Sequence, residues 1–199
     1  MTITSPFGAD GGSVHLMGVA GAGMVSLAEL FVRSGLQVTG CDLQPGPSAR
    51  ALSSWGCEVL SGHDAEHVKD ASVLIVTAAI PEDHPEIRAA HDRGIPVLKR
   101  AEALGMWVNQ GQVVGIAGTH GKTTTTALVA WLLHGTGRDP SLLVGGFCLD
   151  FDGSFREGRG EHFVVEGDEY DTAFFDKTPK FLHYGARTLM ITSVEFDHA

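Results

Sequence analysis

The stretch Gly115-Ile116-Ala117-Gly118-Thr119-His120-Gly121-Lys122-Thr123 decides the fold of the second half of this chain. It follows an apolar run that predicts a strand over 112–117 and precedes a run with helical spacing from 123 to about 134. A Gly-rich turn between a strand and a helix directs backbone N–H groups and the helix N-terminus toward an anion. In such a turn Lys122 can contact nucleotide phosphates and the Thr123 hydroxyl can bind Mg²⁺.

The spacing of this loop departs from the common pattern G-x-x-x-x-G-K-[ST], which would place glycine at position 116. Ile116 stands there, and Gly115 comes one residue earlier. The alternative is a Gly-rich turn with an incidental lysine. The order strand, loop, helix favours a variant phosphate loop.

An acidic cluster follows the predicted strand 162–165. Its members are Glu166, Asp168, Glu169 and Asp171. Carboxylates this close repel one another, and a divalent cation relieves the repulsion. A solvated acidic loop is the alternative, but a strand end near a phosphate loop favours a metal. His198 follows the predicted strand 188–193 and is a further candidate ligand, although a lone histidine is more often structural.

The first half carries a partial dinucleotide fingerprint, Gly21-Ala22-Gly23-Met24-Val25-Ser26, in which Ser26 replaces the third glycine. Asp42 ends the next predicted strand, near the distance expected for a ribose contact, and Thr77 ends another strand at the same sheet edge. NAD binding, nucleotide-sugar binding and a structural turn all remain open for this loop.

Alternating apolar runs and helical patterns predict an α/β fold. We expect a Rossmann-like parallel-sheet domain over 1–108, followed by the start of a P-loop ATPase α/β domain over 109–199. The stretch 151–160 reads as a loop. The second domain lacks a closing helix, so we expect it to be truncated and the chain to be a fragment. The other predicted strands are 13–19, 37–41, 58–60, 73–76, 97–98 and 141–144, and the other helices are 24–34, 49–55, 65–68 and 85–93.

The net charge of −10 argues against nucleic acid as the main partner. Three cysteines without metal-binding spacing indicate a reducing, cytoplasmic setting. The first dozen residues lack the features of a signal peptide, and no run of about 18 apolar residues predicts membrane insertion. The oligomeric state is not predicted.

Several of these stretches resemble the Mur ligase family. Residues 118–125 look like its ATP loop, and residues 15–24, 77–80 and 99–104 look like the members that bind muramate. The resemblance covers nearly the whole chain beyond the first dozen residues. It implies an ATP-dependent ligase that activates the carboxylate of UDP-N-acetylmuramate as an acyl phosphate, which an amine then attacks.

The resemblance also implies roles for individual residues, with ATP and Mg²⁺ as cofactors. Catalysis would rest on Lys122 and His198, and Mg²⁺ would be bound by Thr123, Glu166 and His198. The UDP-sugar would be bound by Gly21, Ala22, Gly23 and Met24, with Asp42 and Thr77 lining the same pocket. The ATP-binding loop would comprise Gly118, Thr119, His120, Gly121, Lys122, Thr123 and Thr124.

Two amine substrates compete within the family. Residues 166–177 and 195–199 read like the members that return the tripeptide L-Ala-γ-D-Glu-meso-diaminopimelate to UDP-N-acetylmuramate in peptidoglycan recycling. Residues 21–24 fit at least as well the members that add L-alanine in peptidoglycan biosynthesis. Family members carry a further C-terminal domain that binds the amine, so we expect this chain to bind UDP-N-acetylmuramate without turnover.

Two other classes of protein are considered. An NAD-dependent oxidoreductase would explain the first Gly-rich loop but not the second loop or the acidic cluster. A P-loop NTPase acting as a switch or motor would not need the N-terminal nucleotide-type domain.

Overall fold

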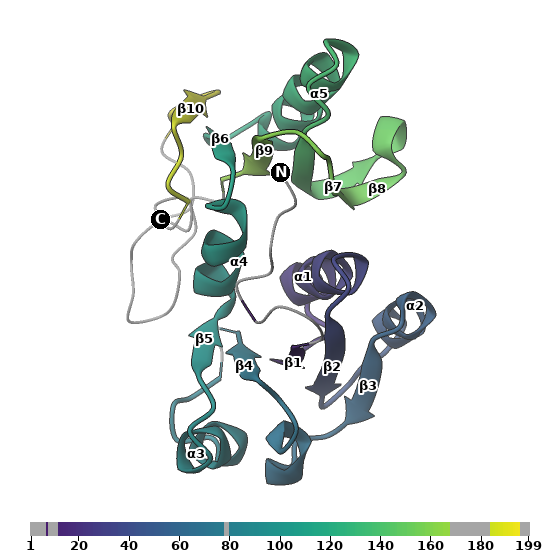
Figure 1. Ribbon diagram of the computed structural model, residues 1–199, viewed down its shortest axis with the longest axis vertical. Helices are drawn as coiled ribbons and strands as arrows, with labels where there is room; N and C mark the ends of the chain where they lie inside the picture. The colour runs from purple at the N-terminus through teal and green to yellow at the C-terminus, as the bar shows by residue number, and fades with distance from the viewer. Residues whose placement is uncertain (1–6, 8–11, 78–79, 168–183, 196–199) are drawn as a thin grey trace. The chain divides into compact units, whose positions relative to one another are not determined.

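The computed structural model describes residue 7 and residues 12–77, 80–167 and 184–195. The chain divides into two compact units between Ala103 and Leu104. Each unit is a sheet with helices packed on it (Figure 1). Within the described ranges, no helix is both long and apolar enough to cross a membrane.

The first unit is built on a parallel sheet with the strand order β3-β2-β1-β4-β5. Helix α1 contacts α2, whereas α3 contacts η1, the pairing expected of a doubly wound sheet. The strands are β1 (Ser13–Met17), β2 (Gln37–Asp42), β3 (Glu58–Ser61), β4 (Val73–Val76) and β5 (Val97–Lys99), and the helices are α1 (Ala22–Arg33), α2 (Ser48–Trp55), the 3-10 turn η1 (Ala65–Val68) and α3 (Pro85–Asp92).

Strand register in the first unit brings the predicted site residues to one sheet edge. Met17 at the end of β1 pairs with Cys41 on β2 and with Val76 on β4. The residues that follow these strand ends are therefore neighbours at the carboxyl edge, where open α/β sheets bind ligands. All four residues of β4 are buried, as a central parallel strand requires.

The second unit is built on a sheet with the order β10-β6-β9-β7-β8. Its pairs are parallel except for the antiparallel pair of β7 and β8. Helix α5 packs on β6, β7 and β9. The elements are β6 (Gln112–Ala117), α5 (Lys122–Gly135), β7 (Ser141–Cys148), the 3-10 turn η2 (Leu149–Phe151), β8 (Gly153–Arg156), β9 (His162–Glu166) and β10 (Thr188–Ile191).

The predicted α/β fold class is confirmed, with two corrections. Residues 151–160 are not simply a loop, because β8 lies within them and pairs with β7. Helix α4 (Arg100–Val108) was not predicted. Helix α4 begins directly after β5, so no turn residues mark its start in the sequence. Its buried residues lie on several sides of the helix, so the sequence also lacks the single apolar face that indicates a helix.

Candidate functional site

The phosphate loop joins β6 to α5 through two glycines with positive φ. Gly118 has φ 127° and Gly121 has φ 76°. A Cβ atom on Gly118 would lie 2.8 Å from the backbone nitrogen of Ser193. Both this close contact and the positive φ therefore exclude a side chain at position 118. Gly121 is the N-cap of α5, which places the positive end of the 14-residue helix at the loop.

Lys122 curls back over the loop. Its Nζ atom donates to the carbonyl oxygen of Gly118 at 2.6 Å and lies 3.4 Å from that of Thr119. An ammonium group held there is placed to contact an anion that sits against the N-terminus of α5.

Thr123 and Glu166 form the other half of this site. The Thr123 hydroxyl donates to Glu166 Oε1 at 3.1 Å, and Glu166 Oε2 accepts from the Gly145 N–H at 2.7 Å. Adjacent ligands of an octahedral Mg²⁺ are roughly 3.0 Å apart when the metal–oxygen bonds are 2.0–2.1 Å. The separation and the hard oxygen atoms therefore fit Mg²⁺.

Two glycines of β7 make room for this pair. A Cβ atom on Gly145 would lie 3.1 Å from Glu166 Oε2, and one on Gly146 would lie 3.2 Å from Thr123 Cγ2. Neither glycine could be recognised from the sequence, because their role depends on the pairing of β7 with β9.

Two residues of the phosphate loop, Thr119 and His120, are hydrogen-bonded to Ser193, which follows β10. The Thr119 N–H donates to the Ser193 carbonyl at 3.1 Å, and the His120 N–H donates to the Ser193 hydroxyl at 3.0 Å. These two donors are engaged within the unit, so the N–H groups at the start of α5 are the ones best placed for a phosphate.

The Gly-rich turn of the first unit joins β1 to α1. The Gly18 N–H donates to the Cys41 carbonyl at 2.8 Å, and the Gly21 N–H donates to the Gly18 carbonyl at 3.2 Å. Gly21 is the N-cap of α1, and the helix begins at Ala22. The first N–H groups of an α-helix have no partner inside the helix, which makes this end suitable for an anion.

Arg100 supplies a positive charge at this helix end. A Cβ atom on Gly23 would lie 3.1 Å from Cζ, Nε and Nη1 of Arg100, so the guanidinium packs directly on the Gly23 backbone. Arg100 was not selected as a site residue from the sequence. The only signal was its place in the stretch 99–104, which resembles the family.

Asp42 and Thr77 lie beside the same turn. Asp42 Oδ2 accepts from the Ala20 N–H at 3.0 Å, and Oδ1 accepts from the Gln44 N–H at 2.9 Å. The Asp42 carboxylate therefore holds the loop in shape. Thr77 Cγ2 would lie 3.1 Å from a Cβ atom on Gly18, which places Thr77 against the start of the turn.

Thr124, predicted to belong to the ATP-binding loop, is exposed in the first turn of α5. Four of the other predicted positions, three acidic residues and one histidine, lie outside the described residues. The role predicted for His198 stays a prediction. The undescribed positions are Asp168, Glu169, Asp171 and His198.

The chain is similar in sequence to known proteins. Residues 13–112 match the sequence profile described as Mur ligase family, catalytic domain. The chain is 42% identical over 185 residues to a UDP-N-acetylmuramate–L-alanine ligase of Rubrobacter xylanophilus, covering 93% of this chain and 40% of the relative. It is 41% identical over 187 residues to the ligase of the same name from Chlorobaculum parvum, covering 94% of this chain and 38% of the relative. The chain thus spans about two fifths of the length of these relatives.

Solved structures give the same family. The UDP-N-acetylmuramate:L-alanyl-γ-D-glutamyl-meso-diaminopimelate ligase of Neisseria meningitides superposes with a TM-score of 0.83 at 34% identity, covering 94% of this chain and 62% of that one. A UDP-N-acetylmuramate–alanine ligase of Thermotoga maritima superposes with a TM-score of 0.77 at 27% identity, covering 94% and 42%. With its profile match and these relatives, the chain belongs to the Mur ligase family.

Proposed function

We infer that this chain is part of an ATP-dependent ligase that joins an amine to the carboxylate of UDP-N-acetylmuramate. The observation that carries this inference is the pairing of Thr123 with Glu166 at 3.1 Å beside a phosphate loop. A carboxylate is a poor electrophile, and transfer of the γ-phosphate of ATP would turn it into an acyl phosphate with a good leaving group. Such a reaction depends mainly on positioning and on neutralising charge.

The second unit supplies the groups that this chemistry needs. Lys122 would move from the Gly118 carbonyl to the nucleotide phosphates, and the N-terminus of α5 would face the same anion. Mg²⁺ held by Thr123 and Glu166, with His198 as the further predicted ligand, would neutralise phosphate charge. We assign residues 109–199 to ATP on these grounds.

The first unit would bind the UDP-sugar, and we assign that role to the predicted domain 1–108, which contains this unit. The pyrophosphate would lie at the start of α1, near residues 21–24, with Arg100 against Gly23. Asp42 would keep the loop in shape. A cytoplasmic location is part of this proposal, because UDP-N-acetylmuramate is a nucleotide-sugar substrate and ATP is its co-substrate.

L-Alanine is the amine that we propose, in peptidoglycan biosynthesis. The two curated relatives above, at 41% and 42% identity, carry the L-alanine ligase name. The tripeptide of peptidoglycan recycling is the second candidate, supported by the 34% identity and TM-score of 0.83 to the Neisseria structure. Comparing the two amines as substrates of the full-length protein tests this choice. A higher kcat/KM for the tripeptide would reverse it.

Binding of UDP-N-acetylmuramate tests the assignment of the first unit. Isothermal titration calorimetry should show that the chain binds UDP-N-acetylmuramate and does not bind NADH. Arg100→Ala should weaken the binding about tenfold or more, because a charge-assisted contact to phosphate contributes roughly 1.5–3 kcal/mol. Arg93→Ala is the matched control, since Arg93 pairs with Glu66 at 2.9 Å on another part of the same unit. Tight NADH binding, or equal losses in both variants, would reject the assignment.

A further inference from the structure

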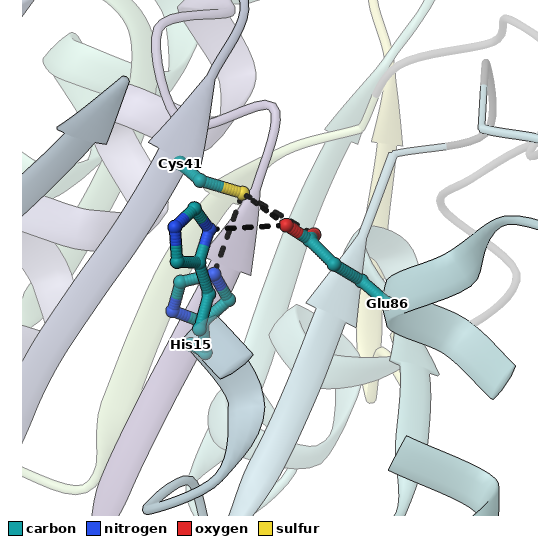
Figure 2. Close-up of side chains that lie close together, drawn as sticks. His15, Cys41 and Glu86 are labelled. Carbon is teal, nitrogen blue, oxygen red and sulfur yellow. Dashed lines mark hydrogen bonds and ion pairs between the residues drawn. The ribbon is translucent and has the colours of Figure 1, made fainter. Parts of the chain in front are cut away.

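Four polar side chains from four elements meet inside the first unit. His15 comes from β1, Cys41 from β2, His67 from η1 and Glu86 from α3. Figure 2 shows His15, Cys41 and Glu86 pointing toward one another. One ligand atom from each of the four residues lies within 4.8 Å of all the others.

The separations inside this cluster match the edges of a small coordination tetrahedron. His15 Nε2 lies 3.4 Å from Cys41 Sγ, and Glu86 Oε1 lies 3.4 Å from the same sulfur. His67 Nδ1 lies 3.1 Å from Glu86 Oε1. Ligands of a tetrahedral zinc ion, with bonds of 2.0–2.3 Å, are roughly 3.3–3.7 Å apart. Three of the six separations are close to this range and all lie within 4.8 Å, so side-chain shifts of up to about 1 Å would create the site.

His15 already has the orientation of a metal ligand. Its Nδ1 atom lies 2.7 Å from Thr39 Oγ1, which can accept the ring N–H and leave the lone pair of Nε2 facing Cys41. Metal-binding histidines commonly donate their other ring N–H to a nearby acceptor in this way.

The Glu86 carboxylate is the anionic group of this cluster. The Glu86 side chain is fully buried and accepts the Asp64 N–H at 2.8 Å. A buried carboxylate is costly unless it is paired or binds a metal.

We propose that His15, Cys41, His67 and Glu86 hold one tetrahedral Zn²⁺ ion that stabilises the first unit. On binding, the Cys41 S–H bond breaks, its proton leaves to solvent and the sulfur bonds to the metal. One thiolate and one carboxylate then balance the two positive charges. Imidazole and thiolate ligands select zinc over Mg²⁺, and four protein ligands leave no open position for catalysis.

The position of the cluster allows an ion to reach it. His15, Cys41 and Glu86 are buried, but the side chains of His67 and His63 are 17% and 14% exposed. His63 Nδ1 lies 3.2 Å from Cys41 Sγ, so it lines the same edge. The competing account is a metal-free polar cluster in which His67 donates to Glu86.

Cobalt substitution tests the proposal in the full chain. After dialysis against a chelator, one equivalent of Co²⁺ should give the strong visible bands of a four-coordinate ion and a thiolate-to-cobalt charge-transfer band. Zn²⁺ should abolish these bands at a ratio of one to one. The absence of the charge-transfer band in the unmodified protein would overturn the proposal.

Two variants identify the ligands. Cys41→Ser should lose the charge-transfer band, whereas Cys57→Ser should keep it, because Cys57 is also buried but lies outside the cluster. His67→Gln, at the partly exposed edge and thus least able to prevent folding, should keep the band and lower Zn²⁺ affinity by at least about tenfold. It should also reduce the rise in melting temperature that Zn²⁺ gives the unmodified protein. Unchanged Zn²⁺ affinity in His67→Gln, or a band that survives in folded Cys41→Ser, would favour the metal-free cluster.

Discussion

Replacing Glu166 with glutamine should weaken divalent-metal binding at the phosphate loop without disturbing the loop. The glutamine amide can still accept the Gly145 N–H and can donate to the Thr123 hydroxyl, so both local contacts have a substitute. What disappears is one negative charge. Even at about 4 Å from a dication, roughly twice the length of a metal–oxygen bond, and at the dielectric constant of water, that charge contributes about 2 kcal/mol, or about thirtyfold in affinity. Lower effective dielectric near the loop would make the loss larger.

Glu161→Gln is the control for this charge. Glu161 precedes β9 and accepts a hydrogen bond from Gln112 Nε2 at 2.8 Å. Five residues along a strand place it roughly 16 Å from Glu166. At that distance the unscreened interaction with a dication is about 0.5 kcal/mol, and a Debye length of about 8 Å reduces it severalfold.

The assay is Mn²⁺ binding, followed by electron paramagnetic resonance in the presence of a non-hydrolysable ATP analogue. The expected result is a loss of about thirtyfold or more for Glu166→Gln and less than about twofold for Glu161→Gln. Equal losses of Mn²⁺ affinity in the two variants would mean that the affinity depends on the net charge of the chain and not on the position of Glu166. An unchanged affinity in Glu166→Gln would refute the assignment of Glu166 as a metal ligand.

Three further predictions concern stability and turnover. Gly40→Ala should lower the free energy of unfolding, measured in urea titrations, by about 1–3 kcal/mol, because the new Cβ atom would lie 2.7 Å from Val19 Cβ. Gly135→Ala is the control and should not lower the free energy of unfolding in this way, because no atom lies within 4 Å of its Cβ position. Asp139→Asn should destabilise the chain at pH 7, since hydrogen bonds from Arg156 and from the Arg159 backbone hold the pKa of Asp139 below its ordinary value. That stabilisation is present above the unfolded pKa and is lost as the pH falls through the lowered folded pKa, so the melting temperatures of variant and parent should converge as the solution is acidified through that folded pKa. The 199-residue chain should release no phosphate from ATP with UDP-N-acetylmuramate and either amine, as it spans about two fifths of its curated relatives, and sustained release would contradict this.

Much of the fold follows from local sequence, because parallel strands and amphipathic helices leave periodic signals. The buried run of β4 and the loop before α5 were predicted within a residue or two of their observed ends. Strand β8 could not be predicted in this way. Its four residues, Gly-Ser-Phe-Arg, have no strong strand pattern, and their pairing with β7 arises only when the chain folds back.

The site residues divide along the same line. Lys122 and Thr123 are contiguous in a motif, so the sequence alone is enough to propose them as site residues. Arg100 reaches Gly23 from 77 positions away in the chain, and the His15 cluster draws on four elements with no shared spacing. Tertiary contacts of this kind leave no periodic signal in one sequence. The predicted site was therefore incomplete where a charge or ligand arrives from a distant element.

The two Gly-rich turns have the same order of strand, loop and helix, yet their acidic residues are used differently. In the first unit both oxygens of Asp42 accept backbone N–H groups, and the positive charge comes from Arg100. An anion can bind there without a metal ion. In the second unit one oxygen of Glu166 faces a hydroxyl rather than the backbone, and the loop carries its own lysine. That arrangement suits an anion that arrives with a divalent cation, as our proposal of ATP for the second unit and a UDP-sugar for the first would require.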